Sequence, residues 1–172
     1  MVARTKWIER QFNFDFPPGV FPNIVERLRG TPARLEDICS NLNHDQMITQ
    51  IDGAWSVQEH VGHLWDLEEL HEGRLDDFLN GAERLRPADM TNKKTYDATH
   101  NENTIEELMK SFRKTRMSFI ERLEQLNDDQ ISLTAQHPRL NKPMRLVDMV
   151  YFAAEHDDHH IAGISIIVNS FG

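Results

Sequence analysis

Hydrophobic residues recur at helical spacing along most of this chain. Over residues 105–126 apolar side chains stand three or four positions apart, which is the period of one helix face. The same spacing predicts long helices over residues 31–43, 56–81 and 145–169. Alternation typical of a strand is confined to residues 12–16, where the following Pro17-Pro18-Gly19 stops it. We therefore expect an all-α fold, a four-helix bundle, with an extended arm over residues 1–20.

Local signals mark where the helices begin and end. Ser56-x-x-Glu59 and Thr104-x-x-Glu107 match the capping box, in which two side chains satisfy free backbone N–H groups of the first turn. Gly30 is typical of a helix C-terminus, and the following Thr31-Pro32 of a new N-terminus. These residues predict a short helix over residues 21–29, separate from the next one.

The segments between the helices are polar. Residues 83–103 predict a long crossing connection, and a loop through Pro138 and Pro143 is expected to lead to the last helix. The acidic residues of the stretch 66–72 are expected to form a hydrated helix face. No repeat or domain boundary interrupts the pattern, so we expect one domain over residues 1–172.

Composition narrows the class of protein. The chain has 172 residues, of which 39% are hydrophobic and 27% charged, and a formal net charge of -9. No run approaches the roughly 20 apolar residues that cross a bilayer, and the first residues are too charged for a signal peptide. An acidic chain also lacks the clustered basic residues that bind nucleic acid. We expect a cytoplasmic protein with neither a membrane nor a nucleic-acid partner.

Histidine is the unusual component, with nine residues. The single cysteine, Cys39, can form neither an internal disulfide nor a cysteine-based zinc site, so a metal would need nitrogen and oxygen ligands. In the last helix His156 and His160 replace apolar residues of the core stripe, one turn apart. Two imidazoles at this spacing can bind one ion. The alternative is a charged surface strip, because Glu155 and Asp157 flank them.

A third ligand would come from the helix over residues 56–81. There His60 and His71 lie nearer the centre of the apolar stripe than His63, so periodicity ranks His60 at least level with His63. Taken singly, His60 and His71 are more typical of satisfied core residues. His159 lies on a flank of the last helix and is a weaker candidate. The remaining three are expected to be solvated loop residues: His44, His100 and His137.

Three segments together resemble the DinB/YfiT-like superfamily of metal-dependent proteins. They are Trp55-Ser56-Val57-Gln58-Glu59-His60-Val61-Gly62-His63-Leu64, Pro143-Met144-Arg145-Leu146-Val147-Asp148 and His156-Asp157-Asp158-His159-His160-Ile161-Ala162-Gly163. The resemblance spans residues 21–171 and implies a dimeric bundle that holds a divalent metal through three histidines. Carried onto this sequence, the ligands are His63, in the Gly-His-Leu step, His156 and His160. One departure is Arg145, where relatives often have a threonine or serine that caps the last helix.

The three histidine ligands that the resemblance implies indicate a metal-dependent reaction. Three neutral imidazoles bind Zn²⁺ and leave one position open, which is typical of a catalytic site, and such a site lowers the pKa of bound water to roughly 7. Ni²⁺ or Fe²⁺ also suits imidazole. The resemblance implies a small-molecule substrate and either hydrolysis or S-transfer from a low-molecular-weight thiol, in a homodimer. No general acid or base is identified.

Two other interpretations stay open at this point. A non-catalytic, stress-related metal-binding module would bind the ion without turning over a substrate. A plain helical scaffold would bind no metal at all.

Overall fold

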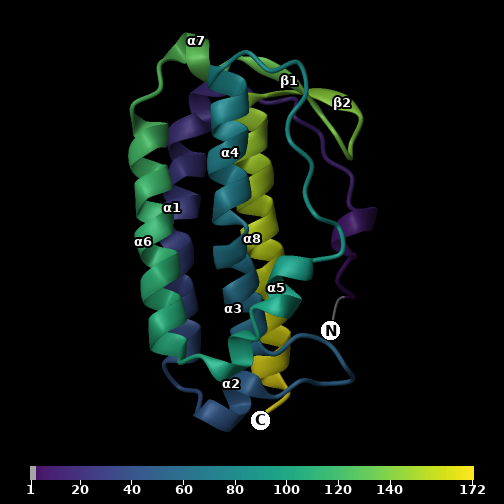
Figure 1. Cartoon of the computed structure of the whole chain (residues 1–172), viewed down its shortest axis with the longest axis vertical. Coiled ribbons are helices and arrows are strands. Elements are labelled where there is room, and N and C mark those ends of the chain that lie inside the picture. The colour runs from purple at the N-terminus through teal and green to yellow at the C-terminus, as the bar shows by residue number, and fades with distance from the viewer. Residues whose placement is uncertain (1–2) are drawn as a thin grey trace.

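The computed structural model describes residues 3–172, so the first two residues of the predicted arm, Met1 and Val2, lie outside the described part. Long helices run side by side along the molecule (Figure 1). They are α1 (Phe21–Cys39), α3 (Val57–Asp66) continued by α4 (Glu68–Leu79), α6 (Ile105–Glu124) and α8 (Leu146–Asn169). Each of α1 and α3–α4 contacts both α6 and α8, which confirms the all-α four-helix bundle.

Shorter elements connect the long helices. They are the 3-10 helices η1 (Trp7–Glu9), η2 (Pro18–Val20) and η3 (His100–Glu102), helices α2 (His44–Ile48), α5 (Lys93–Asp97) and α7 (Asp128–Ile131), and strands β1 (Thr134–His137) and β2 (Lys142–Arg145). The connection from α4 to α6 returns along the bundle through α5, so α6 starts at the same end as α3 (Figure 1). This return brings α5 and η3 against α3.

The expected loop before α8 is a hairpin instead. β1 pairs with β2 antiparallel, with Ala135 opposite Met144, and Arg84 bridges to Gln136 from the other side. Two strands of four residues are too short for alternation to be detected, and their pairing with residues 83–85 is non-local. The prediction of an unstructured loop is therefore wrong for residues 134–145.

Helix α1 passes without a break through Gly30 and Pro32, so the predicted boundary there is wrong. Pro32 has no backbone N–H, and the carbonyl of Leu28 loses its helical donor. The guanidinium of Arg116 on α6 donates to this carbonyl instead, with Nη1 3.1 Å from the oxygen. A tertiary contact thus replaces the missing hydrogen bond, and the helix continues.

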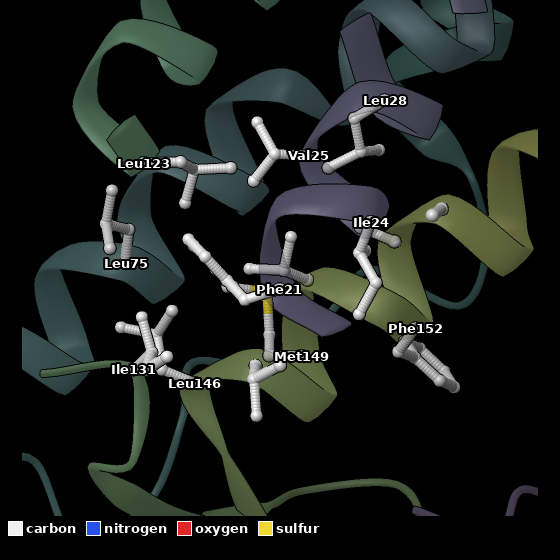
Figure 2. Packing of buried hydrophobic residues seen from close by; sticks show 14 of the residues in the cluster. Phe21, Ile24, Val25, Leu28, Leu75, Leu123, Ile131, Leu146, Met149 and Phe152 are labelled. Carbon is white, nitrogen blue, oxygen red and sulfur yellow. The ribbon is translucent and has the colours of Figure 1, made fainter. Parts of the chain in front are cut away.

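The interior consists of two apolar clusters with a polar layer between them. One cluster gathers around the start of α1, where Leu75, Leu123 and Met149 from three other helices surround Phe21 (Figure 2). The other joins the end of α1 to α3 and to the last turns of α8, and includes Leu35 and Ile164. Burial of these side chains is the main source of bundle stability.

The polar layer is centred on Arg116, whose side chain is fully buried. Its guanidinium donates to Glu68 of α4, with Nη2 2.7 Å from Oε1, and to Asp157 of α8, with Nη1 2.6 Å from Oδ2. Thr31 of α1 also donates to Asp157, at 2.7 Å. Four long helices therefore meet at one ion cluster. The expectation of a hydrated face over residues 66–72 is wrong for Glu68, because Arg116 compensates the cost of its burial.

The N-terminal arm packs on its own bundle. Phe12 is buried, and the rings of Trp7 and Phe152 lie 4.9 Å apart. Arg145 holds the arm to the start of α8, because its Nη2 donates to the carbonyls of Phe14 and Phe16. Among residues 3–172 no helix is both long and apolar enough to cross a membrane.

Candidate metal centre

The structure brings His63 of α3 together with His156 and His160 of α8. Each offers a ring nitrogen, and these three atoms lie within 4.8 Å of one another. His63 and His160 are buried and His156 is partly buried. Two of the three side chains come from one helix face, one turn apart, as the His-x-x-x-His spacing predicts. The third comes from the helix that contacts α8 at the same level.

The distances fit a small divalent ion. Two imidazole nitrogens on one tetrahedral zinc, each 2.0–2.1 Å from it, lie about 3.3 Å apart. The Nε2 atoms of His156 and His160 are 3.1 Å apart. Burial lowers the pKa of His63 and of His156 to about 3 and that of His160 well below its usual range. All three imidazoles are therefore neutral at pH 7, which is the form that binds a metal.

A chain of hydrogen bonds orients His63. The hydroxyl of Thr95 on α5 donates to Oδ2 of Asp66 at 2.8 Å, because a carboxylate can only accept. The oxygen of Thr95 therefore accepts from Nδ1–H of His63, 3.0 Å away. With its proton on Nδ1, His63 keeps a lone pair on Nε2 for a metal. Contacts of this kind fix both the tautomer and the ring orientation of metal-binding histidines.

His100 contacts the same carboxylate oxygen as Thr95, with its Nε2 2.8 Å from Oδ2 of Asp66. Its ring lies against the backbone of α3 at Gly62, where a Cβ atom would stand 2.2 Å from the His100 ring. Glycine is therefore needed for this close approach. The side chain of His100 is 1% exposed, so the expectation of a solvated loop residue is wrong for it. The polar connection over residues 83–103 concealed its burial.

His60 lies behind His160 rather than beside the other two nitrogens. Its Nδ1 is 2.8 Å from Nδ1 of His160 and can accept that proton, which leaves Nε2 of His160 with a lone pair. Periodicity could not separate His60 from His63, because both lie on the buried side of α3. The structure places His60 in contact with a member of the cluster and outside the cluster itself.

Aromatic side chains cover the cluster. Trp55 precedes the cap of α3, and its ring lies 4.6 Å from that of His63. Trp7 of the arm meets His156 edge-on at 4.8 Å. Neither tryptophan was identified as part of the site from the sequence, although Trp55 belongs to the segment that carries the family resemblance. Cys39 is buried elsewhere, and burial raises the pKa of its thiol to about 11.

The three histidines open onto a cavity of about 500 Å³. Its wall is largely apolar, with Trp7, Leu70, Met149 and Phe152 among the lining residues. His137, expected to be a solvated loop residue, is buried and lines this cavity, so that expectation is wrong. A ligand bound there would lie next to the histidine nitrogens, against a largely apolar wall.

The fold and the site define a helical bundle in which three histidines from two helices converge at a cavity. The chain belongs to the DinB superfamily, whose model matches residues 27–164. YfiT from Bacillus subtilis, described as a probable metal-dependent hydrolase with an unusual four-helix bundle topology, is 21% identical in sequence. It superposes with a TM-score of 0.81, over 95% of this chain and 94% of that chain.

A mycothiol-dependent maleylpyruvate isomerase has the same fold at 9% identity and a TM-score of 0.66. The match covers 87% of this chain and 61% of the isomerase, so the isomerase contains a further part. No curated protein matches the sequence significantly. At these identities the solved structures establish the fold, while the site follows from the residues of this chain.

Proposed function

We propose that this protein is a metal-dependent enzyme that acts on a small molecule, of the hydrolase or thiol S-transferase kind. The observation that carries the proposal is the convergence of His63, His156 and His160 at the wall of a cavity. Neither a carboxylate nor a thiol joins this group among residues 3–172. Three protein ligands leave at least one coordination position for a substrate or a nucleophile, which is the arrangement of catalytic zinc sites.

A bound divalent ion would supply Lewis-acid chemistry, which makes water or a thiol more acidic and polarises a carbonyl group. The residues of the chain have other tasks. Thr95 holds the proton of His63 on Nδ1, and His60 contacts Nδ1 of His160. The two tryptophans pack against the rings of His156 and His63. The ion is expected to be Zn²⁺, with Ni²⁺ or Fe²⁺ as the other candidates for imidazole ligands.

The relatives support both kinds of chemistry. YfiT is described as a probable metal-dependent hydrolase, and the isomerase as dependent on mycothiol, a thiol. The alternative, a non-catalytic metal-binding module, would have the same ligands without turnover. The homodimer that the family resemblance implies stays a prediction, because the arm and Ile164 and Ile167 of the C-terminal turns are buried on their own bundle. Light scattering after size exclusion tests it.

The first experiment is metal analysis of protein purified without a histidine tag. We expect close to one equivalent of a divalent metal in the native protein and a large loss in His156→Ala. The matched control is His44→Ala, because His44 is exposed at the start of α2. Less than about a tenth of an equivalent in the native protein, unchanged in His156→Ala and after incubation with Zn²⁺, would exclude the metal site.

The second experiment separates the two chemistries from the alternative. Ester and amide substrates test hydrolysis, and thiol consumption with electrophilic substrates tests S-transfer. Activity that disappears on chelation and returns with one metal supports the enzyme. Metal binding with no turnover in either assay supports the non-catalytic module.

A further inference from the structure

The cavity carries positive charge on the side of the hairpin. Arg74 of α4 and Arg139, in the turn between β1 and β2, line the same cavity as the three histidines. Arg74 is only 3% exposed, and its one hydrogen bond among the described residues runs from Nε to the carbonyl of Arg86 at 3.1 Å. Asp77, the carboxylate whose charge acts on Arg74, is already paired with Arg86 at 2.8 Å.

Neither guanidinium has a counter-ion within the described part of the chain. Several other arginines do form an ion pair, such as Arg27 with Glu155 and Arg145 with Asp148. The shortage is local, because the sequence has 28 acidic residues against 19 basic ones. Burial lowers the pKa of Arg74 to about 10; the charge of Asp77 opposes this shift, and the charge of Arg139 adds to it. Buried cations without partners are costly and are typical of functional sites.

Two further donors on this side have no acceptor. Nη2 of Arg139 is buried and has no hydrogen-bond partner among residues 3–172, and the same holds for Nε2 of His137. Nδ1 of His137 accepts from the backbone N–H of Leu140 at 3.1 Å, so the proton of the neutral ring lies on Nε2. His137, Arg74 and Arg139 line the same cavity. Burial, and after it the charges of Arg74 and Arg139, lowers the pKa of His137 to about 3.

The indole of Trp7 links this group to the histidine cluster. Its ring lies 5.9 Å from Cζ of Arg139 and 4.8 Å from the ring of His156. A small molecule can therefore span both. One carboxylate, Asp89, also lines the cavity, but it is exposed and already accepts from the backbone N–H groups of Thr91 and Lys93.

We propose that Arg74 and Arg139, assisted by His137, form a binding subsite for an oxyanionic group, carboxylate or phosphate, of the small-molecule substrate. The group binds at the hairpin side of the cavity, while the reacting part of the molecule points toward His63, His156 and His160. Guanidinium groups match both oxyanions through paired N–H donors. That the bound anion belongs to a substrate rests on the proposed function. Anion binding at the subsite itself requires no metal.

The test is calorimetric titration of metal-free protein with three phenyl compounds: benzoate, phenyl phosphate and benzamide, which has the shape of benzoate but no charge. We expect at least one anion to bind and benzamide not to bind, and the tighter anion identifies the group. Arg139→Gln and Arg74→Gln should each weaken anion binding at least about tenfold, which corresponds to about 1.4 kcal/mol. If Arg74→Gln does not fold, the half-buried Arg139 carries the test alone.

The matched control is Arg84→Gln. Arg84 donates to the carbonyl of Pro138 at 3.2 Å, so it contacts the same hairpin, but it is exposed and lies outside the cavity. The Arg84→Gln variant should bind the anion with the affinity of the native protein. Equal binding of benzamide and the anions, no anion binding by the native protein, or unchanged affinity in both Arg139→Gln and Arg74→Gln would overturn the proposal.

The outcome is separable from that of the proposed function. The anion titration uses metal-free protein, so its result does not depend on whether the native protein takes up a metal. If the protein binds the anion but takes up no metal, the anion subsite is supported and the metal-dependent enzyme is rejected. If the protein takes up a metal but does not bind the anion, only the anion subsite is rejected.

Discussion

Nδ1 of His63 lies 3.0 Å from the hydroxyl oxygen of Thr95, which itself donates to Asp66. The two residues belong to different segments, α3 and the connection after α4, and meet because that connection returns along the bundle. The contact leaves Nε2 of His63 as the only ring nitrogen free to bind a metal. It also makes the connection over residues 83–103 part of the candidate metal centre.

Thr95→Val should weaken metal binding. Valine has nearly the shape of threonine but no hydroxyl, so His63 loses the acceptor that holds its proton on Nδ1. Loss of such a partner typically costs about 10- to 100-fold in metal affinity. Competition with a chromophoric zinc chelator measures the change. Thr49→Val is the control, since Thr49 is exposed and bonds only to its own helix; equal affinities in the two variants would contradict this role of Thr95.

Gly62→Ala and Gly30→Ala should have opposite effects on stability. At Gly62 the new methyl group would stand 2.2 Å from the ring of His100, whereas at Gly30 nothing lies within 4 Å. Displacing the His100 ring should lower the free energy of unfolding by about 1–3 kcal/mol. Alanine at Gly30, inside α1, should raise it by about 0.5–1 kcal/mol through helix propensity. Urea denaturation of both variants measures the pair, and a stabilised Gly62→Ala would refute the tight contact.

Arg116→Met should destabilise the bundle strongly. The variant leaves Glu68 and Asp157 buried without their cation and also removes the donor to the Leu28 carbonyl. Removing one partner of a buried ion pair costs about 3–5 kcal/mol.

Arg113→Met is the control for this prediction. Arg113 lies one turn earlier on α6 and pairs with Glu36 at the surface, where both side chains are more than 40% exposed. Loss of an exposed pair costs about 0–1 kcal/mol. Urea denaturation of the two variants should therefore differ by at least about 2 kcal/mol, and equal losses would show that the buried cluster contributes nothing beyond a surface pair.

The metal-free protein should lose stability as the pH falls below 6.5. Burial lowers the pKa of His71 in the folded state to about 3, from a usual value of 6.5. Below pH 6.5 the unfolded chain therefore binds a proton at His71 that the folded chain does not bind. The contribution of neutral His71 to the free energy of unfolding is present above pH 6.5 and is lost as the pH falls toward 3. For one such histidine the loss at pH 5.5 is about 1.4 kcal/mol.

His71→Leu removes this proton uptake. Between pH 7.5 and pH 5.5 the variant should lose about 1.4 kcal/mol less stability than the native protein, measured by urea denaturation in the presence of chelator. His44→Leu should follow the native profile, because His44 is exposed. Identical profiles for native protein and His71→Leu would show that His71 is already protonated, or solvated, in the folded state.

Periodicity was sufficient for α6 and α8, but it did not predict the break between α3 and α4 at Leu67. The helix that begins at Ser56 follows its capping box, with both hydrogen bonds between Ser56 and Glu59 present, and α8 spans nearly the predicted residues. It failed where the determining contact is distant in sequence. Locally, Thr31-Pro32 is typical of a helix start. Helix α1 continues through Pro32 because Arg116, on another helix, donates to the carbonyl that Pro32 leaves without a donor.

The same limit applies to the site. The His-x-x-x-His spacing of His156 and His160 is a local property of one helix, and the sequence alone placed both on the core side of α8. Which histidine of α3 joins them depends on ring orientation, and for His63 that orientation is set by Thr95, 32 residues further along the chain. Periodicity ranked His60 at least level, and the resemblance to a family indicated His63.

The amino-acid sequence by itself determined the helices, their buried faces and the use of imidazole, because these depend on residue type and on spacing within a turn or two. The tertiary structure decided how the helices meet. It placed Arg116 between two buried carboxylates, brought Thr95 and His100 to Asp66, and left Arg74 and Arg139 without counter-ions beside a cavity. These features join segments far apart in the chain, and a local pattern contains no information on which distant side chain completes a buried polar group.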